Sequence, residues 1–155
     1  MSTATASDPM DDNPRKRRLH LLARASVAEM EAALSSLAIE GDATFLRGPE
    51  TGLVMVRARM GGTGASFNLG EATMTRATVR LASGAIGHGQ RLGGDKKATR
   101  LAAVLDAAGE DPDLADEIEA FLARIQQRLA TDQARRDAET AATRVDFFTM
   151  VRGDD

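Results

Sequence analysis

Apolar residues recur every three or four positions in the first part of the chain, which is the spacing of an amphipathic helix. Between residues 18 and 39 the residues with this spacing are Leu19, Leu22, Val27, Met30, Leu34 and Leu37. Ser26, followed three positions later by Glu29, matches a capping box, the signature of a helix N-terminus. The pattern therefore predicts two helices that meet near Ser26, the second ending at residues 40–42.

The middle of the chain changes to strand composition, interrupted by turn signals. The segments predicted as strands are 43–48, 52–60, 65–69, 71–82 and 85–92, with breaks at Pro49-Glu50, Gly61 to Gly64, Gly70 and Ser83-Gly84. Residues 71–82 fit neither period cleanly, and their three Thr and one Val favour a strand over a helix. Successive strands joined by turns indicate an antiparallel sheet. We therefore predict an α+β fold, an antiparallel meander of about four to five strands flanked by N-terminal and C-terminal helices.

Helical spacing returns after Gly93-Gly94, where Asp95 is a suitable N-cap and Gly109 a suitable end. Asp111 and Pro112 predict the start of another helix, as N-cap and first-turn proline. Its apolar stripe consists of Leu114, Ile118, Phe121, Leu122, Ile125 and Leu129, and then narrows to Ala130, Ala134, Ala138 and Ala141. A narrow alanine seam with polar flanks is typical of a helix that packs closely on one neighbour.

Composition limits the classes of function. The chain has 155 residues, a net charge of −3 and no cysteine, which excludes disulfides, thiolate metal sites and a Cys nucleophile. Residues 1–14 are predicted to be a disordered leader, and 15–155 a single domain with a docking tail. No apolar run is long enough to span a membrane and the start lacks an apolar signal region, so we expect a cytoplasmic protein. We expect no nucleic-acid partner.

Catalytic side chains are scarce. The only histidines are His20 and His88, each more typical of a structural residue than of a lone catalytic base. The common hydrolase, metalloprotease and P-loop motifs are absent, so the chain alone does not have the pattern of a self-sufficient enzyme. The acidic run from Glu110 to Glu119 lacks the glycine of a calcium loop and is explained by a helix N-terminus, so we predict no metal site.

A glycine-rich loop beside arginines is the first candidate for chemistry, because backbone N–H groups and guanidinium groups both bind phosphate. The candidate phosphate- or phosphonate-binding residues are Arg57, Arg59, Gly61, Gly62, Thr63, Gly64 and Arg76, together with Arg80 if neighbouring strands pair. A plain hairpin turn beside solvated arginines explains the same residues. Lys96, with Lys97, lies in the predicted first turn of a helix and is a second candidate for anions, unless Asp95 balances both lysines.

Two further segments suggest contacts with partners. The basic cluster Arg15 to Arg18 is either a solvated helix start or a contact for an acidic partner surface. The C-terminal tail is unusually apolar for a chain end, since it holds two of the five Phe in the protein. Its predicted docking residues are Arg144, Val145, Asp146, Phe147, Phe148, Met150, Val151 and Arg152. The tail is expected to cover the chain's own core or to insert into a partner.

Three strings of the sequence together resemble one known family. They are Glu50 to Val54 leading through Arg57 into Gly61-Gly62-Thr63-Gly64, Ala72 to Arg76 with Val79 to Leu81, and Arg144 to Asp154. From about Arg17 onward the chain resembles PhnG, the small subunit of the bacterial carbon–phosphorus lyase system. The resemblance implies a core complex with companion H, I and J subunits and an ATPase-like L subunit.

The resemblance also implies a reaction for that complex. Methylphosphonate replaces adenine at C1 of the ribose of MgATP, giving α-D-ribose 1-methylphosphonate 5-triphosphate. MgATP is then a substrate of the complex, and this chain alone binds no cofactor. The I subunit carries the nucleosidase chemistry and the J subunit the radical chemistry. We expect this chain either to shape the active centre through its arginines or, in preference, to scaffold or regulate the I subunit. A stand-alone phosphate- or nucleotide-binding module is the alternative.

Overall fold

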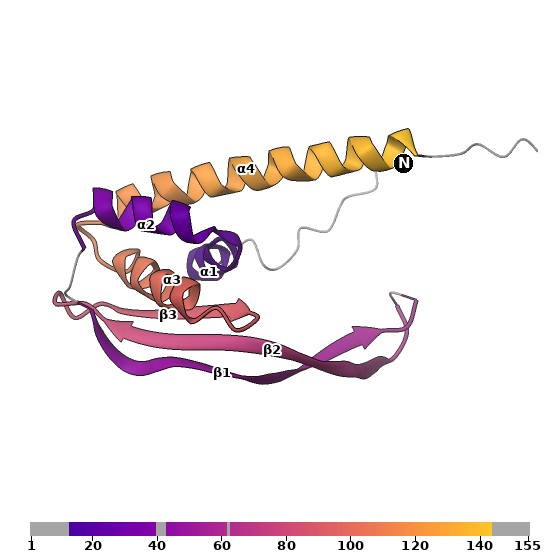
Figure 1. The fold of residues 1–155 in the computed structure, drawn as a ribbon, viewed down its shortest axis with the longest axis horizontal. Coiled ribbons are helices and arrows are strands. Elements are labelled where there is room, and N and C mark those ends of the chain that lie inside the picture. Colours follow the sequence, from indigo (N-terminus) through magenta and orange to yellow (C-terminus); the bar gives the residue numbers. More distant parts are fainter. Residues whose placement is uncertain (1–12, 40–42, 62, 144–155) are drawn as a thin grey trace, which may run out of the picture.

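The computed structural model describes residues 13–39, 43–61 and 63–143. Its elements follow the order α1 (Pro14–Arg24), α2 (Val27–Ser36), β1 (Thr44–Arg59), β2 (Ser66–Arg80), β3 (Ile86–Leu92), α3 (Lys96–Ala108) and α4 (Ala115–Ala142). The sheet forms one layer, α3 lies on it, α1 and α2 lie above α3, and α4 crosses the top (Figure 1). The predicted α+β class, with helices before and after an antiparallel sheet, is confirmed.

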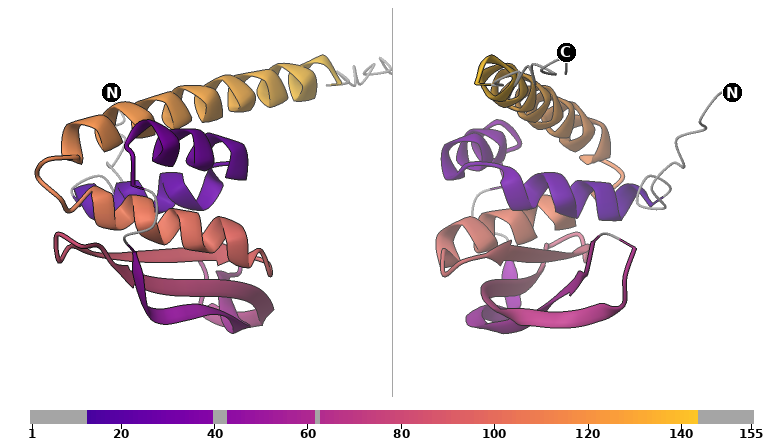
Figure 2. Two further views of the ribbon diagram at one scale, coloured as in Figure 1. Left: turned by 60° about the vertical axis from the view of Figure 1, so that its left-hand side comes forward. Right: turned by 90° about the vertical axis from the view of Figure 1, so that its right-hand side faces the viewer.

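The strands form an antiparallel sheet in the order β1-β2-β3. β1 pairs with β2 along almost its whole length, whereas β3 pairs only with Met74 to Arg80 of β2. Residues 53–59 and 66–73 therefore form a two-stranded ribbon with no third strand, which we call the hairpin arm. Figure 2 shows the helices on one face of the sheet, and Figure 1 shows that the arm extends past α3, which lies against that face.

The structure joins the predicted short strands into longer ones. The predicted breaks at Pro49-Glu50 and Gly70 are wrong, because β1 and β2 run through them. Pro49 lies on an edge strand, where its missing N–H costs little, and the ladder shifts register between Arg47 and Glu50. Two more register shifts lie between Phe45 and Arg47 and after Val56, the partner of Gly70. The strand predicted for residues 71–82 is confirmed up to Arg80.

Local signals placed the junction of α1 and α2 and both ends of α3 correctly, whereas the predicted end of the second helix at residues 40–42 is wrong, because α2 ends at Ser36. The Ser26 side chain accepts from the Glu29 N–H and the Glu29 carboxylate accepts from the Ser26 N–H, so the capping box is confirmed. Asp95 caps α3 as predicted, and Gly109 ends it. The predicted helix start at Asp111-Pro112 is wrong, because α4 begins at Ala115. The Asp111 side chain accepts from Asp113 N–H at 3.1 Å within a turn, and so does not cap a helix.

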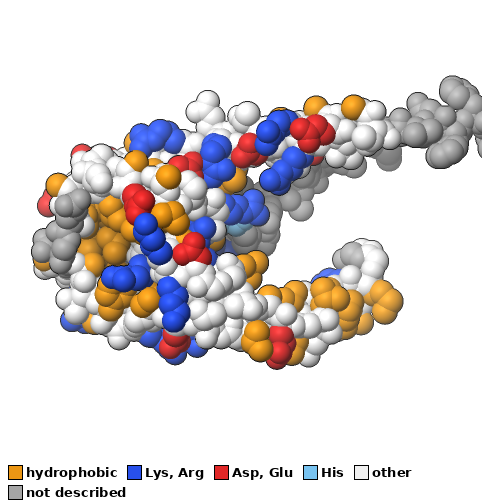
Figure 3. Space-filling view, viewed as in Figure 1, with side chains coloured by type: hydrophobic (Ala, Val, Ile, Leu, Met, Phe, Trp, Pro, Cys, Tyr) orange, Lys and Arg blue, Asp and Glu red, His pale blue; other side chains and the backbone are white. Residues whose placement is uncertain are grey.

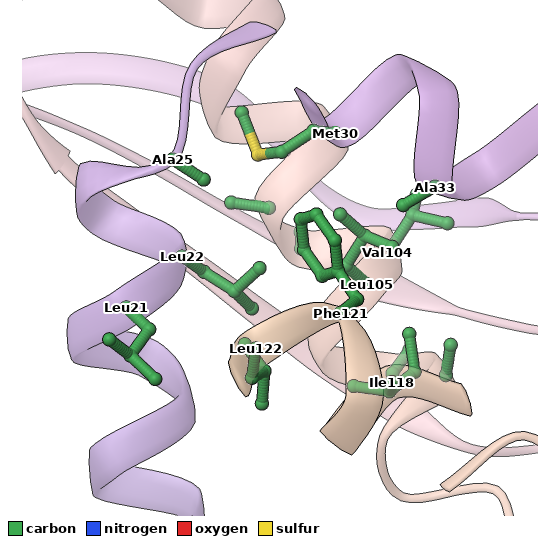
Figure 4. Packing of buried hydrophobic residues seen from close by; sticks show 14 of the residues in the cluster. Leu21, Leu22, Ala25, Met30, Ala33, Val104, Leu105, Ile118, Phe121 and Leu122 are labelled. Carbon is green, nitrogen blue, oxygen red and sulfur yellow. The ribbon is translucent and has the colours of Figure 1, made fainter. Parts of the chain in front are cut away.

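The core lies between the helices, where α3 is enclosed by α1, α2, α4 and the sheet. Figure 4 shows Leu22, Met30, Leu105 and Leu122 converging from four helices. Each of these side chains is at most 1% exposed. Burial of such side chains contributes about 1.5–3 kcal/mol each, so this helical layer carries most of the hydrophobic stabilisation.

Two glycines set the distance between α3 and the sheet. A Cβ on Gly87 would lie 2.2 Å from the carbonyl oxygen of Ala103, and one on Gly89 would lie 2.2 Å from that of Thr99. No side chain fits at these separations. The Gly-His-Gly string of β3 is therefore explained by close packing of helix backbone on strand backbone.

Candidate functional site

A buried carboxylate gathers the basic cluster of α1. Asp106 of α3 is fully buried. Its two oxygens accept hydrogen bonds from Arg18 Nε at 2.8 Å, Arg15 Nη2 at 2.9 Å and the backbone N–H of His88 at 2.9 Å. Arg18 also pairs with Glu110 and donates to the carbonyl oxygen of Gly109 at 3.1 Å. The acidic surface that the cluster contacts therefore belongs to the same chain.

This ion network has the geometry of a cluster that holds α1 and β3 onto α3, and not that of a ligand-binding site. Burial alone would lower the pKa of Arg18, but the hydrogen bonds and charges of Asp106 and Glu110 outweigh it and raise the pKa. Both Asp106 oxygens accept hydrogen bonds within the chain and the side chain is fully buried, so the carboxylate is not exposed to a ligand. Sequence reasoning missed Asp106, although a carboxylate inside the alanine-rich stripe of a buried helix was a usable signal.

His88 and His20 do not form a catalytic group. The Nδ1 atom of His88 lies 3.1 Å from the hydroxyl of Thr78 on the neighbouring strand, while Asp106 binds the backbone of His88 and not its ring. His20 lies exposed on α1, on another element. The structure thus agrees with the interpretation of both histidines as structural or surface residues.

The predicted phosphate-binding residues lie at separate places. Arg57 and Arg59 are exposed at the far end of β1, where they pair in register with Asn68 and Ser66. Gly61, Thr63 and Gly64 form the adjoining turn, in which Arg59 Nη1 donates to the carbonyl oxygen of Gly64 at 3.5 Å, and Gly62 lies outside the described residues.

Arg76 is distant from that turn. It lies opposite Glu50, seven positions along β1 from Arg57, or about 23 Å at ordinary strand rise. Arg76 Nε donates to Glu50 at 2.8 Å. This hydrogen bond and, to a smaller extent, the one from Arg47 lower the pKa of the Glu50 carboxyl. The structure therefore brings the glycine turn, Arg57 and Arg59 together but not Arg76. Phosphate binding by these residues stays a prediction.

Lys96 lies at a third place, beside an apolar groove of about 760 Å³ between α2, β1 and α3. Arg100 stacks on the ring of Phe45 in this groove, 4.7 Å from its centroid. Lys97 pairs with Glu31 of α2 at 2.6 Å, so one of the two candidate lysines is already neutralised. Lys96 remains exposed at the groove's edge, and its predicted anion binding also stays a prediction.

The hairpin arm exposes a concentration of large apolar side chains. Leu53 and Leu69 are each 64% exposed. The other exposed apolar side chains in or beside the arm are Met55, Val56, Met60, Phe67 and Leu92. Figure 3 shows patches of hydrophobic side chains on the projecting end of the sheet. Apolar clusters of this kind are typical of interaction surfaces.

The last half of α4 is a second projecting element. Its buried residues end at Ile125, and residues 133–142 are all exposed, including the alanine seam of Ala134, Ala138 and Ala141. Among the described residues no neighbour covers this seam. α4 and the hairpin arm both project past the core on the same side (Figures 1 and 3). The predicted docking residues Arg144 to Arg152 follow α4 but lie outside the described residues.

Two absences hold for the described part of the chain. No group of three or more His, Cys, Asp or Glu side chains there has the arrangement of a metal site. None of its helices combines the length and apolar character that crossing a membrane requires.

Comparisons with known proteins agree on one family. The family model described as "Phosphonate metabolism protein PhnG" matches residues 13–153. A protein of Rhizobium meliloti (strain 1021), named "Alpha-D-ribose 1-methylphosphonate 5-triphosphate synthase subunit PhnG", is 48% identical over 155 residues, which are 100% of this chain and 99% of that protein. The sequence resemblance is thus confirmed over nearly the whole chain, including the segment that carries the predicted docking tail.

Proposed function

Because the chain belongs to the PhnG family of phosphonate metabolism proteins, we propose that it is a non-catalytic docking subunit of a cytoplasmic synthase complex. The complex transfers methylphosphonate onto C1 of the ribose of MgATP and releases adenine. The C1–N bond to adenine breaks, and a C1–O bond to the phosphonate forms. Within this complex the chain scaffolds or regulates the nucleosidase (I) subunit, beside the H and J subunits and the ATPase-like L subunit.

The observation that carries this proposal is the uncovered hairpin arm. The arm has apolar side chains in water, two strands where the rest of the sheet has three, and open backbone edges on both sides. Each feature costs free energy in an isolated chain and becomes favourable when another protein covers it. A stand-alone module has no use for such a surface, so the arm favours the subunit over that alternative.

The second half of α4 extends the same surface. Its alanines allow another helix to approach closely, and the apolar tail from Val145 to Val151 continues from its end in sequence. Since α4 and the arm project on the same side, one partner can contact both. In this arrangement Arg57 and Arg59, at the end of the arm, lie at the edge of the interface and face acidic groups of the partner.

The test is co-purification of the companion subunits on a tagged chain. Leu53→Asp combined with Leu69→Asp should reduce recovered partner at least about tenfold, because two apolar contacts are lost and two charges are buried. Leu46→Asp is the matched control, since Leu46 is also exposed on β1 but lies outside the arm. Full recovery of the complex with the double variant would overturn the proposal.

Arg57→Ala separates docking from a direct role at the active centre. On this proposal the complex of the variant still assembles and still releases adenine from MgATP with methylphosphonate. An assembled complex that has lost adenine release would favour the phosphate interpretation of Arg57. Deletion of residues 143–155 should abolish co-purification, and an intact, active complex would exclude a docking role for the tail.

A further inference from the structure

A cleft of about 880 Å³ lies beneath α4, between α4, α1 and the end of β3. Its lining is strongly basic, with five arginines and one histidine against one carboxylate, that of Asp132. The basic residues are Arg17, His20, Arg24, Arg91, Arg128 and Arg136. Figure 3 shows basic side chains along α4 and below it, where the molecule is hollowed. The cleft is separate from the hairpin arm and from the glycine turn.

Two of the five arginines already have partners within the chain. Arg17 donates to Glu119 at 2.9 Å and to Gln126 at 2.8 Å. Arg128 pairs with Glu29 at 2.6 Å and with Asp132 at 3.3 Å, which also uses the one carboxylate of the cleft. These pairs hold α1, α2 and α4 together around the cleft. They explain Arg17 and Arg128 but not the other three arginines.

The remaining three arginines are Arg24, Arg91 and Arg136. Within residues 13–39, 43–61 and 63–143, no ion pair joins any of them to a carboxylate. Three guanidinium groups from α1, β3 and α4, none of them ion-paired among the described residues, thus line one cleft. Like charges brought together by three different elements repel one another, and an anion between them removes that repulsion.

Arg91 is the most informative of the three because it is half-buried. Its Nη1 donates to the carbonyl oxygen of Leu22 at 2.5 Å. Burial lowers the pKa of Arg91, and the nearby negative charge of Asp95 offsets only part of this effect. The buried Arg18 shows the contrast, since two carboxylates raise its pKa. A half-buried cation without an ion-pair partner marks the place that an anion would occupy.

We propose that this cleft binds the triphosphate group of a nucleotide or of inorganic tripolyphosphate. Guanidinium groups bind phosphate oxygens in a bidentate manner, and three of them match the charge of a triphosphate better than that of a single phosphate or carboxylate. The volume lies within the usual range for small-ligand sites. The choice of a triphosphate over other polyanions rests on the proposed function, because both the substrate and the product of the proposed complex carry a triphosphate group.

The experiment is isothermal titration of the full-length chain with sodium tripolyphosphate, ATP and AMP at low salt. We expect tripolyphosphate and ATP to bind, AMP to bind at least about tenfold more weakly, and affinity to fall with added salt. Equal affinity for ATP and tripolyphosphate means that the cleft binds the phosphate chain alone, and tighter ATP binding means that the nucleoside adds contacts. Both results support the site.

Variants locate the binding. Arg136→Ala and Arg91→Met should each weaken tripolyphosphate binding about tenfold, the loss of one charge-assisted contact. Arg124→Ala is the matched control, because Arg124 is an exposed arginine of α4 that neither lines the cleft nor pairs with its carboxylate. Circular dichroism checks that each variant is folded. If Arg91→Met does not fold, Arg136→Ala still tests the site, because Arg136 is exposed and its removal should not affect folding.

Absence of tripolyphosphate and ATP binding, or equal weakening by Arg124→Ala and Arg136→Ala, would overturn this site. That outcome leaves the docking proposal standing, since co-purification measures the hairpin arm. Failed co-purification tests conversely leave triphosphate binding by the cleft measurable on the chain alone.

Discussion

Replacing Asp106 by Asn tests whether the buried ion cluster holds α1 and β3 onto α3. The substitution keeps the size of the side chain and removes its charge. Three donors point at this carboxylate, from Arg15, Arg18 and the backbone of His88. An amide has only one oxygen to accept them, and its NH₂ group would face donors. Arg18 would stay buried with Glu110 as its remaining carboxylate.

The magnitude follows from the cost of breaking a buried ion pair. Removing one partner costs about 3–5 kcal/mol, and because Glu110 is retained we expect the lower end, about 3 kcal/mol. For a chain of 155 residues, each kcal/mol lowers the melting temperature by about 2–4 °C. The melting temperature of Asp106→Asn should therefore fall by about 6–12 °C.

The assay is thermal and urea unfolding followed by far-ultraviolet circular dichroism. Glu119→Gln is the matched control. Glu119 of α4 also pairs with an arginine of α1, Arg17, at 2.9 Å, but its side chain is half-exposed. That pair should contribute less than about 1 kcal/mol. A melting temperature for Asp106→Asn within about 3 °C of the control would refute the reasoning, because it would mean that the cluster contributes no more than a surface pair.

Two further predictions concern packing and pH. Gly87→Ala should destabilise the fold by several degrees in a thermal melt, because the added Cβ would lie 2.2 Å from backbone atoms of α3, whereas Gly48→Ala, with nothing within 4 Å, should not; similar melts would contradict the close approach. Burial alone would raise the pKa of Glu29, but hydrogen bonds from Ser26 and the pairing with Arg128 outweigh it and lower the pKa. A lowered pKa stabilises the fold above the ordinary pKa of the group, and this contribution is lost as pH falls. Urea unfolding should therefore show that Glu29→Gln is less stable than the unsubstituted chain at neutral pH, with the difference shrinking as pH falls below the ordinary pKa of a glutamate; a difference independent of pH would contradict it.

Local features of the fold were predictable from the sequence. The capping box of Ser26 and Glu29 and the cap at Asp95 involve residues within one turn of each other, so their geometry follows from the sequence. The β composition of residues 71–82 likewise identified most of β2. The glycine turn and the strings at 50–64 and 144–154 were sufficient to identify the family, which the comparisons confirmed.

Features that depend on distant residues were not predictable. Pro49 and Gly70 read as breaks because their local preferences oppose a strand, yet pairing along β1 and β2 overrides those preferences. Asp106 binds Arg18, 88 residues away in sequence, and Gly87 is required by a helix that follows it in the chain. The spacing of residues along the chain gives no information about contacts between residues so far apart in sequence.

The sequence by itself determined which segments are helical, which are extended and to which family the chain belongs, because spacing, caps and motifs act within a few residues. It did not show that the strands continue through Pro49 and Gly70, or where α4 begins. Only the tertiary structure decided which residues meet. It placed Arg57 and Arg76 apart, left the hairpin arm uncovered, and directed Arg24, Arg91 and Arg136 into one cleft. The physical reason is that charge and apolar surface have their effect through the neighbours that folding supplies, and those neighbours come from elements far apart in the chain.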